Sequence, residues 1–339
     1  NNKHICELGK LDKDNNIPEK NQKKAFAAFK EFAKYIKNEN IEHVLPVATA
    51  AARNANNGRV FVEKAEKILG QKIRILSAQE EAKFAAFGVI ASRLEEDCKD
   101  DIDGIVADLG GGSLELALVE DNEVIDGIST KLGTLVIKEQ DDQIPYIRQT
   151  LEKIDKKYTS AKNLYVIGGS WRAVRKTWAQ SHEDKEIKKS GFDKPNLKRV
   201  PVESVSKHLD HILALRGRDP QSPAKNFDKD LLVESRALSE EFPNLSTDRA
   251  NRIFDASLLL RELINKTTPK NVVFVESGLR EGLVYNYFLQ SVLTFETAKH
   301  FFITDAPAGP ESASDHKQEA KARAQINSTG KPAPLSKKA

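Results

Sequence analysis

The sequence contains no methionine and two cysteines, and none of its apolar runs approaches the length of a membrane span. Cys6 and Cys98 lie far apart, without a neighbouring cysteine or a histidine pair at metal-binding spacing, so we expect neither a disulfide framework nor a zinc site. A membrane-spanning helix needs about 20 apolar residues, and the polar opening lacks the apolar core of a secretory signal. We therefore expect a cytoplasmic protein that does not contact a membrane.

An excess of one charge is also lacking. The 53 basic and 50 acidic residues leave a formal charge of +3, which is too small to indicate nucleic-acid binding by itself. Any preference for anions must come from local clusters. The absence of methionine, including an initiator, indicates an incomplete record of the gene product, so short unbroken motifs are more informative than long spacings.

Alternating helices and strands predict an α/β fold, and the length of 339 residues favours two domains. The expected helices cover about 18–37, 59–69, 78–94, 144–158, 203–215, 228–240 and 247–265. We expect Gly70 to end the second of them as a left-handed C-cap. The expected strands cover 44–47, 72–76, 104–109, 114–119, 124–131, 164–167 and 272–275. The third to fifth form a β-meander, with GGGS and the EDN segment, residues 120–122, as its turns. The charged stretch 95–103 separates the predicted domains 1–103 and 104–304, and we expect 305–339 to be a mobile tail.

The strongest local signal is IVADLGGGSLELALV, residues 105–119. Gly110, Gly111, Gly112 and Ser113 form a turn between two strands, where glycine exposes backbone N–H groups that can wrap a phosphate. Asp108 and Glu115 at its edges can hold a divalent cation or orient water. The alternative is a glycine-rich hairpin with solvated carboxylates, although a tight hairpin needs only one or two glycines.

A second glycine pair follows the strand 164–167. Gly168, Gly169 and Ser170 precede a basic helix start, an arrangement that can bind an anion at the helix N-terminus. A close strand-to-helix turn can select glycine for packing alone, so this signal gains weight only beside the first loop. A set of basic residues could form a track for an anion on the second domain, although surface solvation is the default explanation for each of them individually. These residues are Arg172, Arg175, Lys176, Lys188, Lys189, Lys194, Lys198 and Arg199.

Three further side chains are candidates at the mouth of the first domain. Glu80 and Glu81 open the third helix, where acidic residues also simply complement the helix dipole. The functional alternative is that one of them removes a proton from an attacking water. Arg53 follows the strand 44–47, at the edge where α/β folds bind ligands, and can clamp phosphate oxygens.

Together, VATAAARNANNG, SAQEEAKFAAFG, DLGGGSLEL, KLGTL, VIGGSWRAV, RANRIFDASLLLRELI and SGLREGLVY resemble the Ppx/GppA phosphatase family over about residues 5–285. DLGGGSLEL is shared with the actin-like, sugar-kinase and Hsp70 superfamily, whereas the EEA and GLREG segments are more particular. The resemblance implies two ribonuclease-H-like, actin-like domains that face an interdomain cleft. It also implies Mg²⁺-dependent release of a terminal phosphate from inorganic polyphosphate or guanosine pentaphosphate (pppGpp).

The resemblance also assigns roles. Glu81 matches the catalytic base, Glu115 the second essential carboxylate, and Asp108 the acidic residue before the phosphate loop. Asp108 and Glu115 are therefore the expected metal ligands, and Arg53 the expected phosphate clamp. Family members usually begin with a strand and a phosphate loop of the type Asp-x-Gly-Ser-x-Ser. We expect this segment to lie upstream of Asn1; the alternative is a truncated, inactive protein. A homodimer is the assembly to be tested.

Two rival interpretations remain. An actin-superfamily kinase or ATPase would need a nucleoside pocket near the second glycine pair, and bulky Trp171 and Arg172 argue against adenine there. A regulator could instead bind guanosine tetra- or pentaphosphate, or polyphosphate, without turnover. The presence of both Glu81 and Glu115 favours an enzyme.

Overall fold

The computed structural model describes residues 3–96, 101–181, 199–215, 238, 241–242 and 247–292. The chain divides into two compact units, Asn1–Leu283 and Val284–Ala339. The second unit is described only over 284–292, which form the later part of helix α12 (Leu279–Val292). Apart from Leu238, the helix predicted at 228–240 lies outside the described residues, as does the predicted tail.

Helices α1 and α3 form a small layer in the first 76 residues, over a two-stranded parallel sheet. Their apolar stripes meet around Phe61, and the ring of Phe26 stacks on it with centroids 5.2 Å apart. Gly70 ends α3 in the left-handed conformation (φ 72°), as the sequence predicts, and its N–H donates to Glu66 O. The elements are α1 (Glu19–Asn38), β1 (Val47–Ala48), α2 (Ala50–Asn54), α3 (Gly58–Leu69) and β2 (Arg74–Ile75).

The strand predicted at 44–47 is displaced. Only Val47 and Ala48 pair with β2, and 44–46 lie outside the strand. Pro46 contributes its carbonyl oxygen, which accepts the Arg74 N–H, but a proline has no N–H to donate in return. The apolar run does contain a strand, but its proline shortens that strand to two residues.

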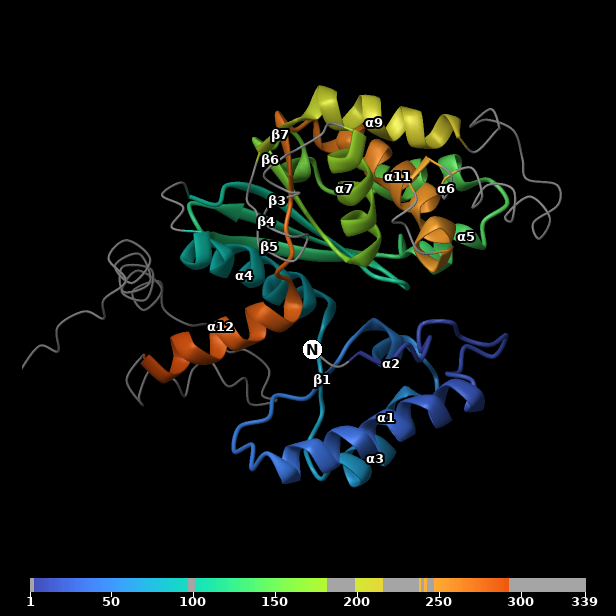
Figure 1. Cartoon of the computed structure of the whole chain (residues 1–339), viewed down its shortest axis with the longest axis vertical. Helices are drawn as coiled ribbons and strands as arrows, with labels where there is room; N and C mark the ends of the chain where they lie inside the picture. The colour runs from blue at the N-terminus through green and yellow to red at the C-terminus, as the bar shows by residue number, and fades with distance from the viewer. Residues whose placement is uncertain are drawn as a thin grey trace, which may run out of the picture. The chain divides into compact units, whose positions relative to one another are not determined.

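A six-stranded sheet with the order β5–β4–β3–β6–β8–β7 organises the rest of the first unit (Figure 1). Strands β3, β6 and β8 run parallel, whereas β4, β5 and β7 are antiparallel to their neighbours. The strands are β3 (Gly104–Leu109), β4 (Leu114–Glu120), β5 (Glu123–Thr130), β6 (Asn163–Ile167), β7 (Arg199–Pro201) and β8 (Asn271–Phe274). The predicted β-meander is thus confirmed.

Helices cover both faces of this sheet (Figure 1). Helix α4 (Ala78–Glu96) packs on β3, β4 and β5, while α7 (Gly169–Ser181) and α9 (Val202–Ala214) lie on the other face. Helix α11 (Thr247–Thr267) packs on α7 and α9. Because α4 precedes residue 103 yet packs on this sheet, it links the two predicted domains, whose boundaries stay a prediction.

The hairpin turn between β4 and β5 shows why the EDN segment was predictable. Asp121 and Asn122 both have positive φ, 49° and 68°, which is the conformation a two-residue hairpin favours. The Asn122 side chain is buried, donates to Asp101 Oδ1 at 2.6 Å and accepts the Ile102 N–H at 2.8 Å. The turn is therefore tied to the start of β3.

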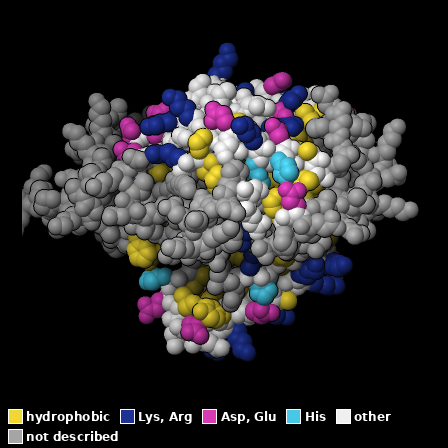
Figure 2. Space-filling model, turned by 45° about the horizontal axis from the view of Figure 1, so that its top comes forward, with side chains coloured by type: hydrophobic (Ala, Val, Ile, Leu, Met, Phe, Trp, Pro, Cys, Tyr) yellow, Lys and Arg dark blue, Asp and Glu magenta, His cyan; other side chains and the backbone are white. Residues whose placement is uncertain are grey.

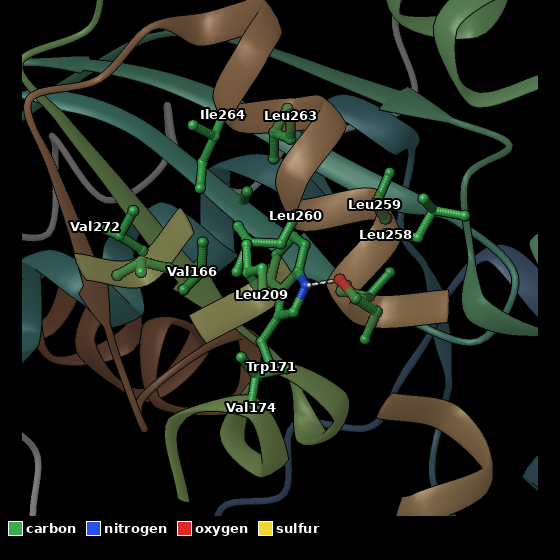
Figure 3. Packing of buried hydrophobic residues seen from close by; sticks show 14 of the residues in the cluster. Val166, Trp171, Val174, Leu209, Leu258, Leu259, Leu260, Leu263, Ile264 and Val272 are labelled. Atoms are coloured by element: carbon green, nitrogen blue, oxygen red, sulfur yellow. Dashed lines mark hydrogen bonds between the residues drawn. The ribbon is translucent and has the colours of Figure 1, made fainter. Parts of the chain in front are cut away.

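The main core lies between the sheet and α7, α9 and α11. In Figure 3, Trp171 and Val174 point from α7 toward Leu209 and the leucines of α11. The Trp171 indole N–H donates to the Ala256 carbonyl oxygen at 2.9 Å, so the largest core side chain keeps its polar atom paired. Trp171 is fully buried, so its bulk does not project beside Gly169 as the argument against adenine binding assumed, whereas Arg172 is partly exposed.

Several short elements were not predicted. The helix expected at 144–158 ends early, as α6 (Gln143–Glu152), and a 3₁₀ turn η1 (Lys156–Tyr158) follows it. The Asp155 side chain accepts the Lys157 N–H and so starts that separate turn. Helix α5 (Thr134–Lys138), strand β7 and helix α12 were also not predicted from the sequence. The segment of α12 was interpreted only as a family motif.

Candidate active site

Three loops meet at one edge of the six-stranded sheet. The parallel strands β3, β6 and β8 all end there, and α/β folds bind ligands at the carboxyl ends of such strands. The two predicted glycine loops are in contact, because a Cβ on Gly168 (φ 118°) would lie 2.5 Å from Leu109 O. The third loop, 275–278 after β8, was not predicted to take part.

The first glycine loop is held open by a neighbouring turn. Gly110 N–H donates to Ser113 O at 3.0 Å, and Gly111 O accepts the Leu135 N–H at 2.9 Å. Gly133 must be glycine, since a Cβ there would lie 2.3 Å from Gly111 O. Within the described residues, no hydrogen bond engages the N–H groups of Gly111 and Gly112. These amides are available to an anion.

Two carboxylates flank this loop on adjacent strands. Asp108 and Glu115 are opposite one another in the antiparallel register, so their side chains lie on the same face of the sheet. Burial, followed by repulsion from Glu81, raises the pKa of Glu115 to about 8, although Ser129 Oγ donates to it at 2.9 Å. Burial and Glu81 also raise the pKa of Asp108 to about 6, while Arg172 counteracts this shift. Both carboxyl groups therefore resist carrying negative charge together.

Glu80 and Glu81, adjacent at the start of α4, have separate functions. Ser77 and Glu80 form a capping box: Ser77 N–H donates to Glu80 Oε2 at 2.8 Å, and Glu80 N–H donates to Ser77 Oγ at 3.2 Å. Glu80 also pairs with exposed Arg74. Glu81 is 7% exposed and raises the pKa of both Asp108 and Glu115. Of these two glutamates, Glu81 is the one that faces the other carboxylates.

Arg53 fixes the position of Glu81. Its Nη1 donates to Glu81 Oε2 at 2.8 Å and to Leu76 O at 2.7 Å, which joins α2 to the beginning of α4. Among the described residues, no hydrogen bond engages Glu81 Oε1. In this structure Arg53 thus orients a carboxylate, and its predicted role as a phosphate clamp stays a prediction.

One member of the predicted basic track does not lie on the surface. Arg175 is 4% exposed, and its guanidinium, like that of Arg172, binds Glu276. Lys188, Lys189, Lys194 and Lys198 lie outside the described residues. On the face drawn in Figure 2, the coloured Lys and Arg side chains are interspersed with Asp and Glu.

These features can be compared with known proteins. The model of the Ppx/GppA phosphatase family matches residues 2–291. The chain belongs to this family. Guanosine-5'-triphosphate,3'-diphosphate pyrophosphatase of Photobacterium profundum is 24% identical over 276 residues, covering 81% of this chain and 51% of the relative. The Vibrio parahaemolyticus protein of the same name is 27% identical over 280 residues, with the same two coverages. The chain spans about half the length of the curated relatives it matches.

Solved structures support the Ppx/GppA fold. The Aquifex aeolicus family member superposes with a TM-score of 0.64 at 21% identity, covering 85% of this chain and 88% of that one. An exopolyphosphatase from Cytophaga hutchinsonii superposes with a TM-score of 0.63 at 17% identity, covering 80% of this chain and 83% of that one. These similarities confirm the predicted α/β fold class, in the form found in Ppx/GppA proteins. In the described residues of this Ppx/GppA chain, every helix is too short or too polar to span a bilayer.

The carboxylates of this Ppx/GppA chain suit a Mg²⁺ ion that is shared with a substrate. In the part of the chain that the structure describes, no three His, Cys, Asp or Glu side chains are grouped closely enough to form a metal cage. Mg²⁺, however, is usually bound by one or two carboxylates together with substrate phosphates and water. Burial, and after it repulsion from Glu81, raises the pKa of both Asp108 and Glu115, and a bound cation would favour their charged forms.

Sequence reasoning missed the third loop of the Ppx/GppA site. Gly278 N–H donates to Glu281 Oε2 at 2.9 Å at the start of α12, and Glu281 contributes to the raised pKa of Asp108. Glu276 binds two arginines of α7. The signal was available in SGLREG, where glycine followed three residues later by glutamate is a helix start. The turn near Gly9 was also missed; a Cβ there would lie 3.9 Å from Gly112 N.

Proposed function

We propose that this chain forms the phosphate-cleaving site of a hydrolase that removes the terminal phosphate from inorganic polyphosphate or pppGpp. The observation that carries this proposal is the meeting of the unengaged Gly111 and Gly112 amides with the carboxylates of Glu81, Asp108 and Glu115. Amides bind phosphate oxygens, and carboxylates supply a base and cation ligands. Membership of a phosphatase family and the names of the relatives support the same reaction class.

In the proposed reaction, Glu81 takes a proton from water as the water oxygen forms a bond to the terminal phosphorus. The bond from that phosphorus to the bridging oxygen breaks, which releases orthophosphate and a chain shortened by one phosphate. Arg53 orients Glu81 through Oε2, and Oε1, which has no hydrogen bond among the described residues, would accept the proton. The loop at Gly110, Gly111, Gly112 and Ser113 holds the phosphate oxygens, and Gly168, Gly169 and Ser170 lie beside it.

Asp108 and Glu115 would hold Mg²⁺ in this proposal. The ion would neutralise the phosphate oxygens when it is bound. The protein's own contribution is positioning and preorganised charge, which account for most of the catalysis in phosphoryl transfer. Ser129, whose hydroxyl donates to Glu115, fixes the rotamer of that carboxylate.

The test measures phosphate released from long-chain polyphosphate and from pppGpp in the presence of Mg²⁺, using the full-length protein. Glu81→Gln should lower the turnover number by about 100-fold or more, the usual contribution of a general base. Glu80→Gln is the matched control, because Glu80 carries the same charge one residue away but caps α4. It should change stability and leave turnover within about threefold.

Each alternative makes its own prediction. Tight binding of either anion without any release by the wild-type protein would favour the regulator that binds without turnover. Release that depends on a nucleotide co-substrate would favour a kinase or ATPase. Equal turnover by the Glu81→Gln and wild-type proteins would show that Glu81 is not the base.

A further inference from the structure

A cluster of two arginines and one glutamate lies at the ligand edge of the sheet. Arg172 Nη1 donates to Glu276 Oε2 and Arg175 Nη1 donates to Glu276 Oε1, both at 3.0 Å. Two guanidinium groups thus share a single carboxylate, which leaves the cluster with one positive charge in excess. Glu276 follows the buried end of β8 after one further residue, the buried Val275, so the cluster is fixed to the core.

The two arginines are in different environments. Arg175 is 4% exposed and donates to Glu276 through Nη1, so it is a fixed counter-ion of that carboxylate. Its Nη2 has no hydrogen-bond partner among the described residues. The side chain of Arg172 is 37% exposed. It lies in the first turn of α7, where its N–H donates to Gly168 O at 3.0 Å. Arg172 can therefore leave Glu276 without leaving that carboxylate unpaired, because Arg175 remains bound to it.

Arg172 also lies close to the first glycine loop. Its backbone N–H donates to Gly168 O, and a Cβ on Gly168 would lie 2.5 Å from the carbonyl oxygen of Leu109, the residue before Gly110. A substrate with several phosphates adds further negative charge at this place. A cation beside the second glycine loop would balance the phosphate that does not react.

We propose that Arg172 is a substrate-binding residue, which moves from Glu276 to the second phosphate of a polyphosphate chain, the one next to the terminal phosphate. This inference rests on the proposed function, because it assumes that the terminal phosphate occupies the Gly110–Ser113 loop. A partly exposed ion pair contributes little to stability, whereas a guanidinium that binds phosphate with two N–H groups forms a strong charge-assisted contact. The exchange of partners is therefore favourable when substrate is present.

Binding is measured separately from turnover. Isothermal titration calorimetry with inorganic tripolyphosphate and Mg²⁺ is carried out on full-length protein carrying Glu81→Gln, which prevents hydrolysis. Adding Arg172→Ala should raise Kd about tenfold or more, which corresponds to about 1.4 kcal/mol. Arg172→Lys should also weaken binding, since lysine cannot replace a bidentate contact.

Two variants control for structural effects. Arg148→Ala breaks a different ion pair, in which Arg148 of α6 binds Glu262 of α11. This variant should leave the Kd for tripolyphosphate within about twofold of the parent protein. Glu276→Gln keeps the shape of the side chain but removes the charge that holds Arg172. The Kd for tripolyphosphate should therefore stay the same or fall. If Glu276→Gln and Arg172→Ala weaken binding equally and lower Tm equally, Arg172 only supports the fold and the inference is wrong.

Further outcomes separate this inference from the proposed function. Tripolyphosphate binding that depends on Arg172, in a protein whose wild type releases no phosphate, would support the inference and overturn the hydrolase. Turnover by the wild-type protein, together with an unchanged Kd and KM in Arg172→Ala, would support the hydrolase and overturn the inference. Orthophosphate binding should be unaffected by Arg172→Ala, and an equal loss for orthophosphate would overturn the assignment to a second phosphate. Failure of wild-type protein to bind tripolyphosphate overturns both.

Discussion

Adjacent residues of the same type differ in this molecule because a helix turns about 100° per residue. Glu80 and Glu81 both occupy the first turn of α4, and both complement the helix dipole. Glu80 closes the capping box with Ser77, whereas Glu81 meets Arg53 and the carboxylates of β3 and β4. The capping-box spacing of Ser77 and Glu80 is visible in the sequence, but only the packing of α4 on the sheet brings Glu81 to these carboxylates.

Glu115 supports a prediction about stability. Its pKa is raised to about 8 in the folded chain, mainly by burial, so the folded state binds the proton more tightly than the unfolded state does. This contribution stabilises the protein below the usual pKa of a glutamate and is lost as the pH rises through about 8. Glu115→Gln keeps the shape and removes the charge. It should raise the free energy of unfolding by about 1–3 kcal/mol at pH 9, given about 1.4 kcal/mol per pKa unit, and by much less at pH 5.

The measurement is urea unfolding at pH 5, 7 and 9 in the presence of a metal chelator. Glu262→Gln is the control, because Glu262 is equally buried but is held by Arg148 at 2.7 and 3.2 Å. Glu262→Gln should lower the free energy of unfolding by about 1–3 kcal/mol, because it removes charge-assisted hydrogen bonds. A destabilising effect of Glu115→Gln at pH 9 would show that Glu115 is not a strained carboxylate.

At the scale of elements, α4 and the start of α12 cross with their backbones in contact. A Cβ on Gly282 would lie 1.8 Å from Phe84 O, and one on Gly88 would lie 2.1 Å from Gly278 O. Two glycines, one from each helix, therefore permit this approach. The crossing joins the helix that carries Glu81 to the loop that carries Glu276, and so it helps to fix the geometry of the site.

Gly282→Ala should accordingly destabilise the protein by about 2 kcal/mol or more, since an added methyl group must push the two backbones apart. Gly112→Ala is the matched control, because nothing lies within 4 Å of a Cβ there. It should change stability by less than about 0.5 kcal/mol while weakening phosphate binding at the loop. Thermal unfolding and tripolyphosphate titration together distinguish the two; a loss of stability in Gly112→Ala equal to that in Gly282→Ala would contradict this description.

At the scale of the whole molecule, binding and stability are linked. The net charge of +3 provides little general attraction for a polyanion, so affinity must come from the local site. With Mg²⁺ and tripolyphosphate at about 100 times Kd, the folded state should gain about 2.7 kcal/mol. In Glu81→Gln protein, Mg²⁺ and tripolyphosphate together should raise Tm more than either of them does alone. In the wild-type protein, chelation of Mg²⁺ should abolish phosphate release. An unchanged turnover in the presence of chelator would exclude the metal role of Asp108 and Glu115.

The sequence by itself determined the elements whose causes are local. The alternating apolar strands, the glycine that ends α3 and the turn at Asp121 and Asn122 depend on neighbours along the chain, and each was confirmed. The α/β fold class and the family follow from the same short motifs. Where a local rule competed with another, as with Pro46 at the predicted strand, the boundary was misplaced.

Only the tertiary structure decided which side chains meet. The Arg53–Glu81 pair joins positions 28 residues apart, and the Arg172–Glu276 pair joins positions 104 apart. Such contacts depend on the order of strands in the sheet, which places the ends of β3, β6 and β8 at one edge. The burial of Arg175 and Trp171 has the same origin, because a helix face is covered only when its partners have packed.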